Sequence, residues 1–152
     1  MAQRVDQRDP TRVELDAYNK VLKLSDHVLS VCKPREAKPN NHHIPKRNLV
    51  LGRMMMEIVV EMGADILDAN LIYVGGNLPK DDRLRNYRER IRLQDHAKRL
   101  TYRAEHIFRI LHFNTPFAES TVKYMMDLIC ETRDLITAWR ESDLRASKQL
   151  RK

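Results

Sequence analysis

Six prolines and the pair Gly75 and Gly76 divide this chain of 152 residues into four long stretches. Proline lacks a backbone donor and clashes with the preceding helical turn, so a long helix must fit between successive prolines. Within each stretch, apolar residues recur three or four positions apart, and no segment alternates as a strand would. The sequence therefore predicts helices over about residues 11–33, 46–74, 80–112 and 116–146.

Short connections between long helices are typical of an antiparallel up-down four-helix bundle, and we predict this all-α fold. We expect residues 1–10 to be an N-terminal tail, residues 11–146 to form the bundle, and residues 147–152 to be a basic C-terminal tail. The segment 34–45 holds three prolines and two asparagines, so it is expected to be a loop.

Two helix starts have sequence signals. Thr11 and Glu14 have the spacing of a capping box, in which the side chain of each residue accepts a hydrogen bond from the backbone N–H of the other. Thr115 directly precedes Pro116, which favours Thr115 as the N-cap of the fourth helix and Pro116 as its first residue.

The second predicted helix is apolar on two roughly opposite sides. One row consists of Leu51, Met55, Ile58, Met62, Ile66, Ala69 and Tyr73. The other row consists of Leu49, Met56, Val60, Leu67 and Leu71. Gly52 and Gly63 lie between the rows and would allow another helix to approach closely. A helix that is apolar on two sides is buried on both, so we predict a homo-oligomer whose interface includes the second row. The other interpretation is a thick core with some exposed apolar side chains.

The third predicted helix adds a smaller hint of self-association. Its core row is expected to be Leu93, Ala97, Leu100, Ala104, Ile107 and Leu111. Leu84, Tyr87 and Ile91 point about the opposite way on a helical projection. These three side chains would then also be available to a partner.

Basic residues are concentrated in the third predicted helix. The chain has a formal net charge of +7, and residues 80–109 hold ten Lys or Arg against five acids. Bases one turn apart repel one another, so a polyanion is the simplest partner that would favour them. Aromatic residues make up only 6% of the chain, which favours contacts to phosphates over stacking on bases as the main mode. The residues expected to contact nucleic acid or a polymerase are Arg85, Arg88, Arg92, Arg99, Arg103, Arg145, Lys148, Arg151 and Lys152.

Glu57, Glu61, Asp65 and Asp68 form an acidic strip along the second predicted helix. This strip could neutralise part of the basic row. Carboxylates at this spacing can also hold Mg²⁺, as they do in all-α nucleotide pyrophosphohydrolases, but the second acidic cluster of those enzymes is missing. We therefore favour salt bridges to a basic neighbour, and predict no metal ion and no cofactor. His42 and His43 are interpreted as a polar pair in the loop.

No catalytic motif appears in the sequence: there is no nucleophile elbow, no phosphate loop and no Cys–His signature. The function is therefore predicted to be non-enzymatic. Cys32 and Cys130 lack the spacing of a metal or redox motif and are expected to be buried free thiols in a reducing compartment. No signal peptide and no apolar run of 18 residues is present, so a cytoplasmic protein without a membrane partner is expected.

Four short motifs resemble the accessory variability proteins of diversity-generating retroelements, which are related in fold to four-helix proteins encoded in ribosomal RNA intervening sequences. The first motif is Pro45-Lys46-Arg47 followed by Leu51-Gly52, and the second is Ile66-Leu67-Asp68-Ala69-Asn70. The others are Leu100-Thr101-Tyr102-Arg103-Ala104 and Arg133-Asp134-Leu135-Ile136-Thr137-Ala138-Trp139. The resemblance covers about residues 13–140. This chain departs from the family at Thr137-Ala138, where a glycine often precedes the tryptophan.

The resemblance implies a homopentameric barrel of four-helix bundles that binds the retroelement reverse transcriptase and its template RNA. Such a protein supports the error-prone cDNA synthesis of mutagenic retrohoming without being an enzyme. Two alternatives stay open from the residues alone. One is a stand-alone DNA- or RNA-binding accessory protein without a polymerase partner, and the other is the Mg²⁺-dependent nucleotide pyrophosphohydrolase.

Overall fold

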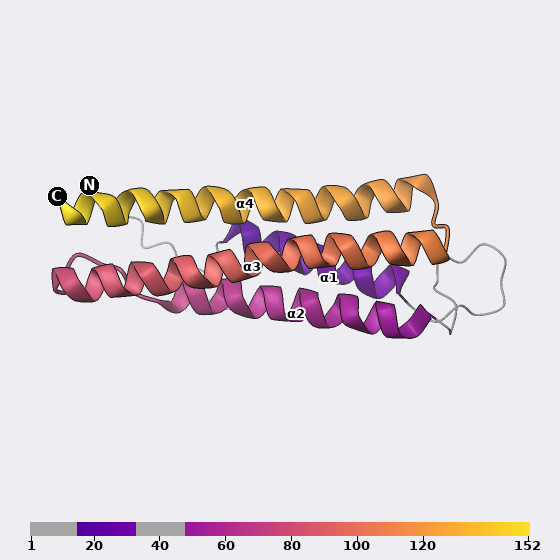
Figure 1. Cartoon of the computed structure of the whole chain (residues 1–152), viewed down its shortest axis with the longest axis horizontal. Coiled ribbons are helices and arrows are strands. Elements are labelled where there is room, and N and C mark those ends of the chain that lie inside the picture. The colour runs from indigo at the N-terminus through magenta and orange to yellow at the C-terminus, as the bar shows by residue number, and fades with distance from the viewer. Residues whose placement is uncertain (1–14, 33–47) are drawn as a thin grey trace, which may run out of the picture.

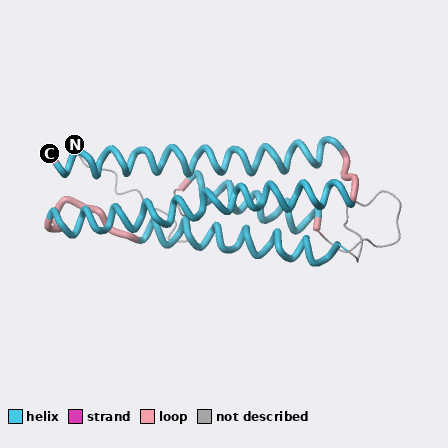
Figure 2. The backbone as a smooth tube through the Cα atoms, in the orientation of Figure 1, coloured by secondary structure: helices cyan, strands magenta, loops and turns pink. Residues whose placement is uncertain are grey.

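The computed structural model describes residues 15–32 and 48–152, which form four helices lying side by side along the long axis of the molecule (Figure 1). The helices are α1 (Asp16–Val31), α2 (Leu49–Leu71), α3 (Lys80–Asn114) and α4 (Glu119–Arg151). No strand occurs in the described part of the chain (Figure 2). The predicted all-α class and the number of helices are confirmed. None of these helices is long and apolar enough to cross a membrane.

Each helix packs against two others. The shorter helix α1 packs on α2 and α4, while α3 also packs on α2 and α4. Their apolar rows meet in one core, because burying these rows removes apolar surface from water. The largest fully buried side chains of this core are Leu24, Met55, Met62, Ile66, Leu100, Phe108, Leu111, Met125, Ile129 and Ile136.

Gly63 lies where α1 and α2 come close together. A Cβ atom at this position would meet Val21 Cγ1 at 3.4 Å and the Tyr18 ring at 3.8 Å. The absence of a side chain therefore lets the Val21 side chain of α1 lie directly on the backbone of α2. This agrees with the close approach expected from the sequence.

The start of α4 differs from the prediction. Thr115 does not cap α4: it follows the last residue of α3, and its amide donates to the Leu111 carbonyl at 2.7 Å. Its hydroxyl accepts a hydrogen bond of 2.8 Å from Asn48 Nδ2, so it joins two segments far apart in the sequence. The helix α4 begins only at Glu119, because the chain first turns to bury Phe117 against Phe108, with ring centroids 5.7 Å apart.

The end of α4 also differs from the prediction. A basic tail was expected from residue 147, but α4 continues to Arg151. Its last turns remain helical because one side of them is buried: Asp143 and Ser147 are each only 6% exposed. The expected segment boundary at residue 146 is therefore not a boundary of the helix.

Several side chains of α2 and α3 face other directions than expected. Leu49 and Met56 belong to the second apolar row of α2, yet they are partly buried against the core. Tyr87 was expected to point away from the core but is 7% exposed. Tyr73 was placed in the core row, but α2 ends at Leu71 and the Tyr73 side chain is exposed.

Some predictions fall outside the described residues. These are the tail 1–10, the capping box at Thr11, the loop 34–45 and its histidine pair, and the basic residues at 46 and 47. The two cysteines are described: both are free and half-buried rather than fully buried. Burial raises the pKa of the Cys32 thiol to about 11, so this thiol stays protonated at neutral pH.

The contact between α3 and α4 contains a buried ion pair. Arg90 donates to both carboxylate oxygens of Asp143 at 3.0 Å, and the two side chains are 14% and 9% exposed. Gln94, which is buried, donates to the same carboxylate at 2.6 Å. The Arg90 guanidinium also lies 5.4 Å from the centre of the Trp139 ring. A bidentate pair of this kind fixes the register of α3 against α4.

Two further ion pairs in the described chain continue along the same contact. Arg133 of α4 donates to Glu105 of α3 at 2.7 Å, and Arg140 of α4 pairs with Asp95 of α3. Arg133 Nε also donates a hydrogen bond to the Thr101 hydroxyl oxygen at 3.0 Å. The α3–α4 contact is therefore held by charge as well as by apolar burial.

Replacing Asp143 by alanine should lower the free energy of unfolding by about 3 kcal/mol, because Arg90 would be left buried without a partner. Chemical denaturation followed by circular dichroism measures this change. The double variant Arg90→Met with Asp143→Leu should recover most of the loss. Asp127→Ala, which breaks an exposed pair with Lys123, is the matched control and should leave stability nearly unchanged. A small effect of Asp143→Ala would show that the buried pair does not stabilise the fold.

Candidate nucleic-acid interface

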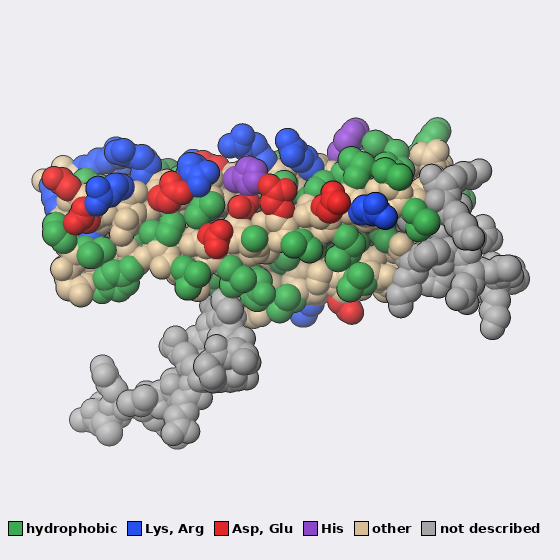
Figure 3. Space-filling model, turned by 90° about the horizontal axis from the view of Figure 1, so that it is seen from below, with side chains coloured by type: hydrophobic (Ala, Val, Ile, Leu, Met, Phe, Trp, Pro, Cys, Tyr) green, Lys and Arg blue, Asp and Glu red, His purple; other side chains and the backbone are tan. Residues whose placement is uncertain are grey.

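Five arginines form an exposed row along α3. Arg85, Arg92 and Arg99 are spaced seven residues apart, and Arg88 and Arg103 lie one turn from this series. All five side chains are exposed. Figure 3 shows Lys and Arg side chains gathered along one edge of the molecule, with a band of acidic side chains beside them. The row predicted from the sequence therefore exists as a surface.

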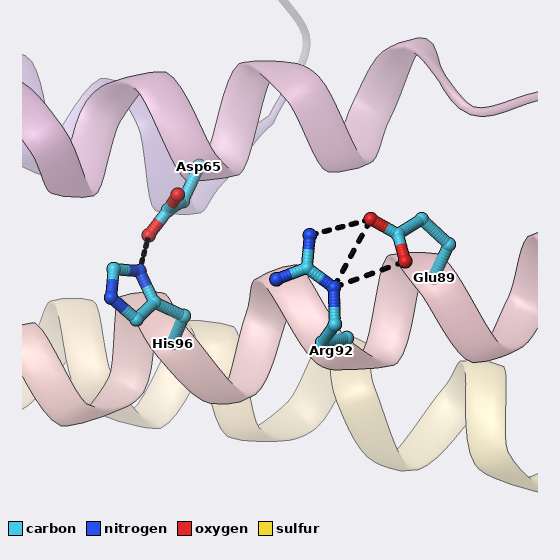
Figure 4. Close-up of polar contacts among 4 residues, drawn as sticks. All are labelled: Asp65, Glu89, Arg92 and His96. Atoms are coloured by element: carbon cyan, nitrogen blue, oxygen red, sulfur yellow. Dashed lines mark hydrogen bonds and ion pairs between the residues drawn. The ribbon is translucent and has the colours of Figure 1, made fainter.

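The row is only partly neutralised by acids of its own helix. Arg85 pairs with Asp82, and Arg92 donates from Nε to both oxygens of Glu89 at 3.1 and 3.0 Å (Figure 4). The hydrogen bonds from Arg92 lower the pKa of the Glu89 carboxyl. Exposed pairs of this kind hold little free energy and open readily, so these two arginines remain accessible to another anion.

Arg88, Arg99 and Arg103 form no ion pair with any described residue. Their guanidinium groups are thus free to donate to a ligand from the described surface. Guanidinium groups match phosphate oxygens well, since each presents two parallel donors.

The acidic strip of α2 contacts α3 mainly through His96. The His96 Nδ1 atom is hydrogen-bonded to the Asp65 carboxylate (Figure 4). Its Nε2 atom lies 3.6 Å from Glu61 Oε1. Burial raises the pKa of the Asp65 carboxyl, while the hydrogen bond from His96 opposes this effect. None of the five arginines pairs with α2 in the described chain. In the described chain, the acidic strip of α2 therefore contacts His96 and leaves the five arginines without a partner from α2.

His96 is near Asp65 and Glu61, but these side chains are not arranged as a metal site. Among the described residues, no group of three or more His, Cys, Asp or Glu side chains is placed to hold a metal ion. Along a helix, acids three or four residues apart point in similar directions but stay apart, so a metal site needs ligands from a neighbour. Here the facing helix α3 offers Arg103 and His106 in the same region.

The basic residues of α4 lie at the same end of the molecule as the start of α3 (Figure 1). Arg145, Lys148, Arg151 and Lys152 are exposed. Because α4 stays helical to Arg151, the first three stand on a helix rather than on a tail. The α4 bases and the start of the arginine row therefore lie at the same end of the α3–α4 contact as the ion pair between Arg90 and Asp143.

Three arginines that the sequence did not distinguish have a structural role. Arg90, Arg133 and Arg140 pair across the α3–α4 contact instead of facing solvent. A signal for this existed in α4. Its core positions follow the series Ile129, Thr132, Ile136, Asp143 and Ser147, so a charged residue stands where an apolar one is expected.

The predicted oligomer interface divides into buried and exposed parts. Val60 and Leu71 are 64% and 78% exposed, while Leu49 and Met56 are partly buried within the chain. Leu67 lines a groove of about 320 Å³ between α1 and α2, together with Leu22 and Gly63. On the face of the molecule drawn in Figure 3, apolar side chains are spread over the part away from the basic edge. The basic edge and the apolar surface therefore occupy separate parts of the face drawn in Figure 3.

Comparisons with protein-family models, with curated proteins and with solved structures found no match to this chain.

The pKa of Asp65 is expected to respond in opposite directions to two substitutions. His96→Ala removes the hydrogen bond that lowers this pKa, so the pKa should rise further above its ordinary value. Asp68→Asn removes a neighbouring negative charge, so the pKa should fall. A titration of the carboxyl ¹³C resonance measures both changes.

The raised pKa of Asp65 also makes the free energy of unfolding depend on pH. Because the pKa of Asp65 is raised in the folded protein, its ionised form is disfavoured, and the free energy of unfolding falls as the pH rises through that pKa. The fall should be larger in His96→Ala than in the unsubstituted protein. If the pKa of Asp65 moved in the same direction in His96→Ala and in Asp68→Asn, this result would contradict the assigned contacts.

Proposed function

We propose that this protein is a non-enzymatic, homo-oligomeric scaffold that binds nucleic acid through α3 and the end of α4. The observation that carries the proposal is the exposed arginine row, in which Arg88, Arg99 and Arg103 lack an ion pair within the described chain. Each arginine that contacts a phosphate releases condensed counterions, so binding should weaken steeply with salt. Contacts of this type read little sequence.

The partner that fits best is a retroelement reverse transcriptase with its template RNA. This part of the proposal comes from the resemblance of the four sequence motifs to accessory variability proteins. The resemblance also supplies the homopentamer, whereas the proposed antiparallel arrangement of the four helices rests on the short connections between them. In this role, the basic surface would hold the RNA near the polymerase during error-prone cDNA synthesis. The runner-up is a stand-alone DNA- or RNA-binding protein that needs no polymerase.

Reversing Arg92 and Arg99 to glutamate should reduce RNA affinity by at least about tenfold at low salt, because two phosphate contacts become repulsive. Fluorescence anisotropy with a labelled RNA, across a series of salt concentrations, measures the loss and the change in slope. The control is Lys23→Glu with Arg53→Glu, which reverses two exposed bases on α1 and α2. Helicity should be unchanged in both variants.

The two pairs of substitutions make the result interpretable. Equal loss in both variants would show that only net charge matters and would contradict a defined surface on α3. Unchanged affinity in the folded Arg92 and Arg99 variant would exclude these residues from the interface. Adding a retroelement reverse transcriptase to the assay separates the proposed scaffold from the stand-alone protein, since only the scaffold should bind it.

Self-association should depend on the exposed part of the apolar surface. Val60→Glu with Leu71→Glu places two charges where the side chains are 64% and 78% exposed, so each chain should still fold. Light scattering should then give a particle close to the 18.0 kDa of one chain instead of a multiple of it. The control, Ser120→Glu with Ala138→Glu, adds the same charges to exposed positions of α4. A multiple of 18.0 kDa that persists in the first variant would exclude this surface as the interface.

A further inference from the structure

A groove runs between α2 and α3 beside the arginine row. It has a volume of about 590 Å³, which lies within the range of roughly 300–1,000 Å³ of small-molecule sites. The wall from α2 consists of Met54, Glu57, Ile58 and Glu61, and the wall from α3 consists of Tyr102, Arg103, His106 and Ile107. The groove thus combines an apolar lining with acceptors on one side and donors on the other.

The charged groups of the two walls do not form close ion pairs with one another in the described chain. Glu57 and Arg103 line opposite walls, but neither forms an ion pair within the described chain. Glu61 has only a distant contact with His96, at 3.6 Å, and its side chain is 53% exposed. A ligand in this groove would therefore find carboxylate acceptors on α2 and a guanidinium donor on α3 without first breaking a close pair.

Tyr102 provides a rigid aromatic surface in the groove. The guanidinium of Arg133 lies over its ring, 3.8 Å from the ring centre. Arg133 is itself held by Glu105 at 2.7 Å and by the Thr101 hydroxyl at 3.0 Å. The Tyr102 side chain nevertheless remains 52% exposed. A ring that is supported from one side and open to solvent is suited to stacking on a nucleobase.

We propose that the α2–α3 groove binds an unpaired guanine nucleotide of the nucleic acid held by the arginine row. The guanine ring stacks on Tyr102. Its N1–H and N2–H₂ groups donate to Glu57 and Glu61, and its O6 and N7 atoms accept from Arg103. The phosphates on either side continue along α3 toward Arg99. This inference rests on the proposed nucleic-acid function and adds a base preference to it.

The arrangement of donors and acceptors selects guanine over the other bases. Guanine alone presents two adjacent N–H donors on its pairing edge, which match the two oxygens of a carboxylate. Adenine and cytosine each place an acceptor nitrogen beside their amino group, and uracil flanks its single N–H with two carbonyls. Those acceptors would face a carboxylate that cannot donate. On the other side, arginine bound to O6 and N7 is the commonest specific contact to guanine.

The test compares four labelled RNA octamers: octauridine, and octauridine with one central guanine, adenine or cytosine. Fluorescence anisotropy is measured with the full chain at a salt concentration at which octauridine binds weakly. The guanine octamer should bind about tenfold more tightly than the other three, which is the lower end of what one bidentate base contact contributes. All four should weaken similarly with added salt, since their phosphates are the same.

Variants identify the groove as the origin of the preference. Glu57→Gln with Glu61→Gln should abolish the guanine preference without weakening octauridine binding, since the change removes negative charge. The matched control, Glu119→Gln with Asp134→Asn, removes two exposed carboxylates of α4 and should keep the preference. Tyr102→Ala should lose the preference, and Tyr102→Phe should retain it because the ring is preserved.

The outcomes separate this inference from the function on which it rests. Equal binding of all four octamers, or a guanine preference that persists in the Glu57 and Glu61 variant, would overturn the guanine site. Salt-dependent octauridine binding would in that case still support the phosphate-binding surface. Failure to bind any octamer at low salt would overturn both proposals.

Discussion

The structure depends on α3, a helix that buries one side while the arginines on its opposite side repel one another. Like charges one turn apart destabilise an isolated helix by a few tenths of a kcal/mol for each pair. Full burial of one large aliphatic side chain contributes about 1.5–3 kcal/mol. The row of Leu100, Ile107 and Leu111 is almost fully buried between α2 and α4. Tertiary packing therefore outweighs the repulsion, and the exposed arginines need no acidic neighbour to keep α3 helical.

The arginines of α3 and α4 divide into two groups with different physical roles. Arg90, Arg133 and Arg140 pair with acids across the α3–α4 contact, where desolvation makes a missing partner costly. Each exposed arginine forms at most a weak ion pair within the described chain, because solvent screens its charge. The first group fixes how α3 lies on α4, and thereby brings the bases of α4 to the same end as the start of the exposed row. The second group remains available to a polyanion.

The surfaces of the molecule are separated in a way that suits a scaffold. The basic row lies on one edge, the groove with Tyr102 and Glu57 lies beside it, and apolar side chains are spread over the rest of the face drawn in Figure 3. Nucleic acid and a second chain could then bind at the same time without competing for one surface. A base held in the groove would also position the strand along α3, since phosphate contacts alone permit sliding.

Local patterns in the sequence were sufficient for the class and number of helices, the start of α3 at Lys80 and the exposed arginine row. Proline positions and a 3.6-residue period depend only on the chain itself. The sequence did not predict that Arg90 is buried, that α4 starts at Glu119 and continues to Arg151, or that Met56 packs on the core. Nor could it show that Tyr102 and Glu57 line one groove, since these residues are far apart in the chain. Each of these features depends on which side chain a neighbouring helix brings opposite, and only tertiary packing decides that, because a helical period specifies a face but not its partner.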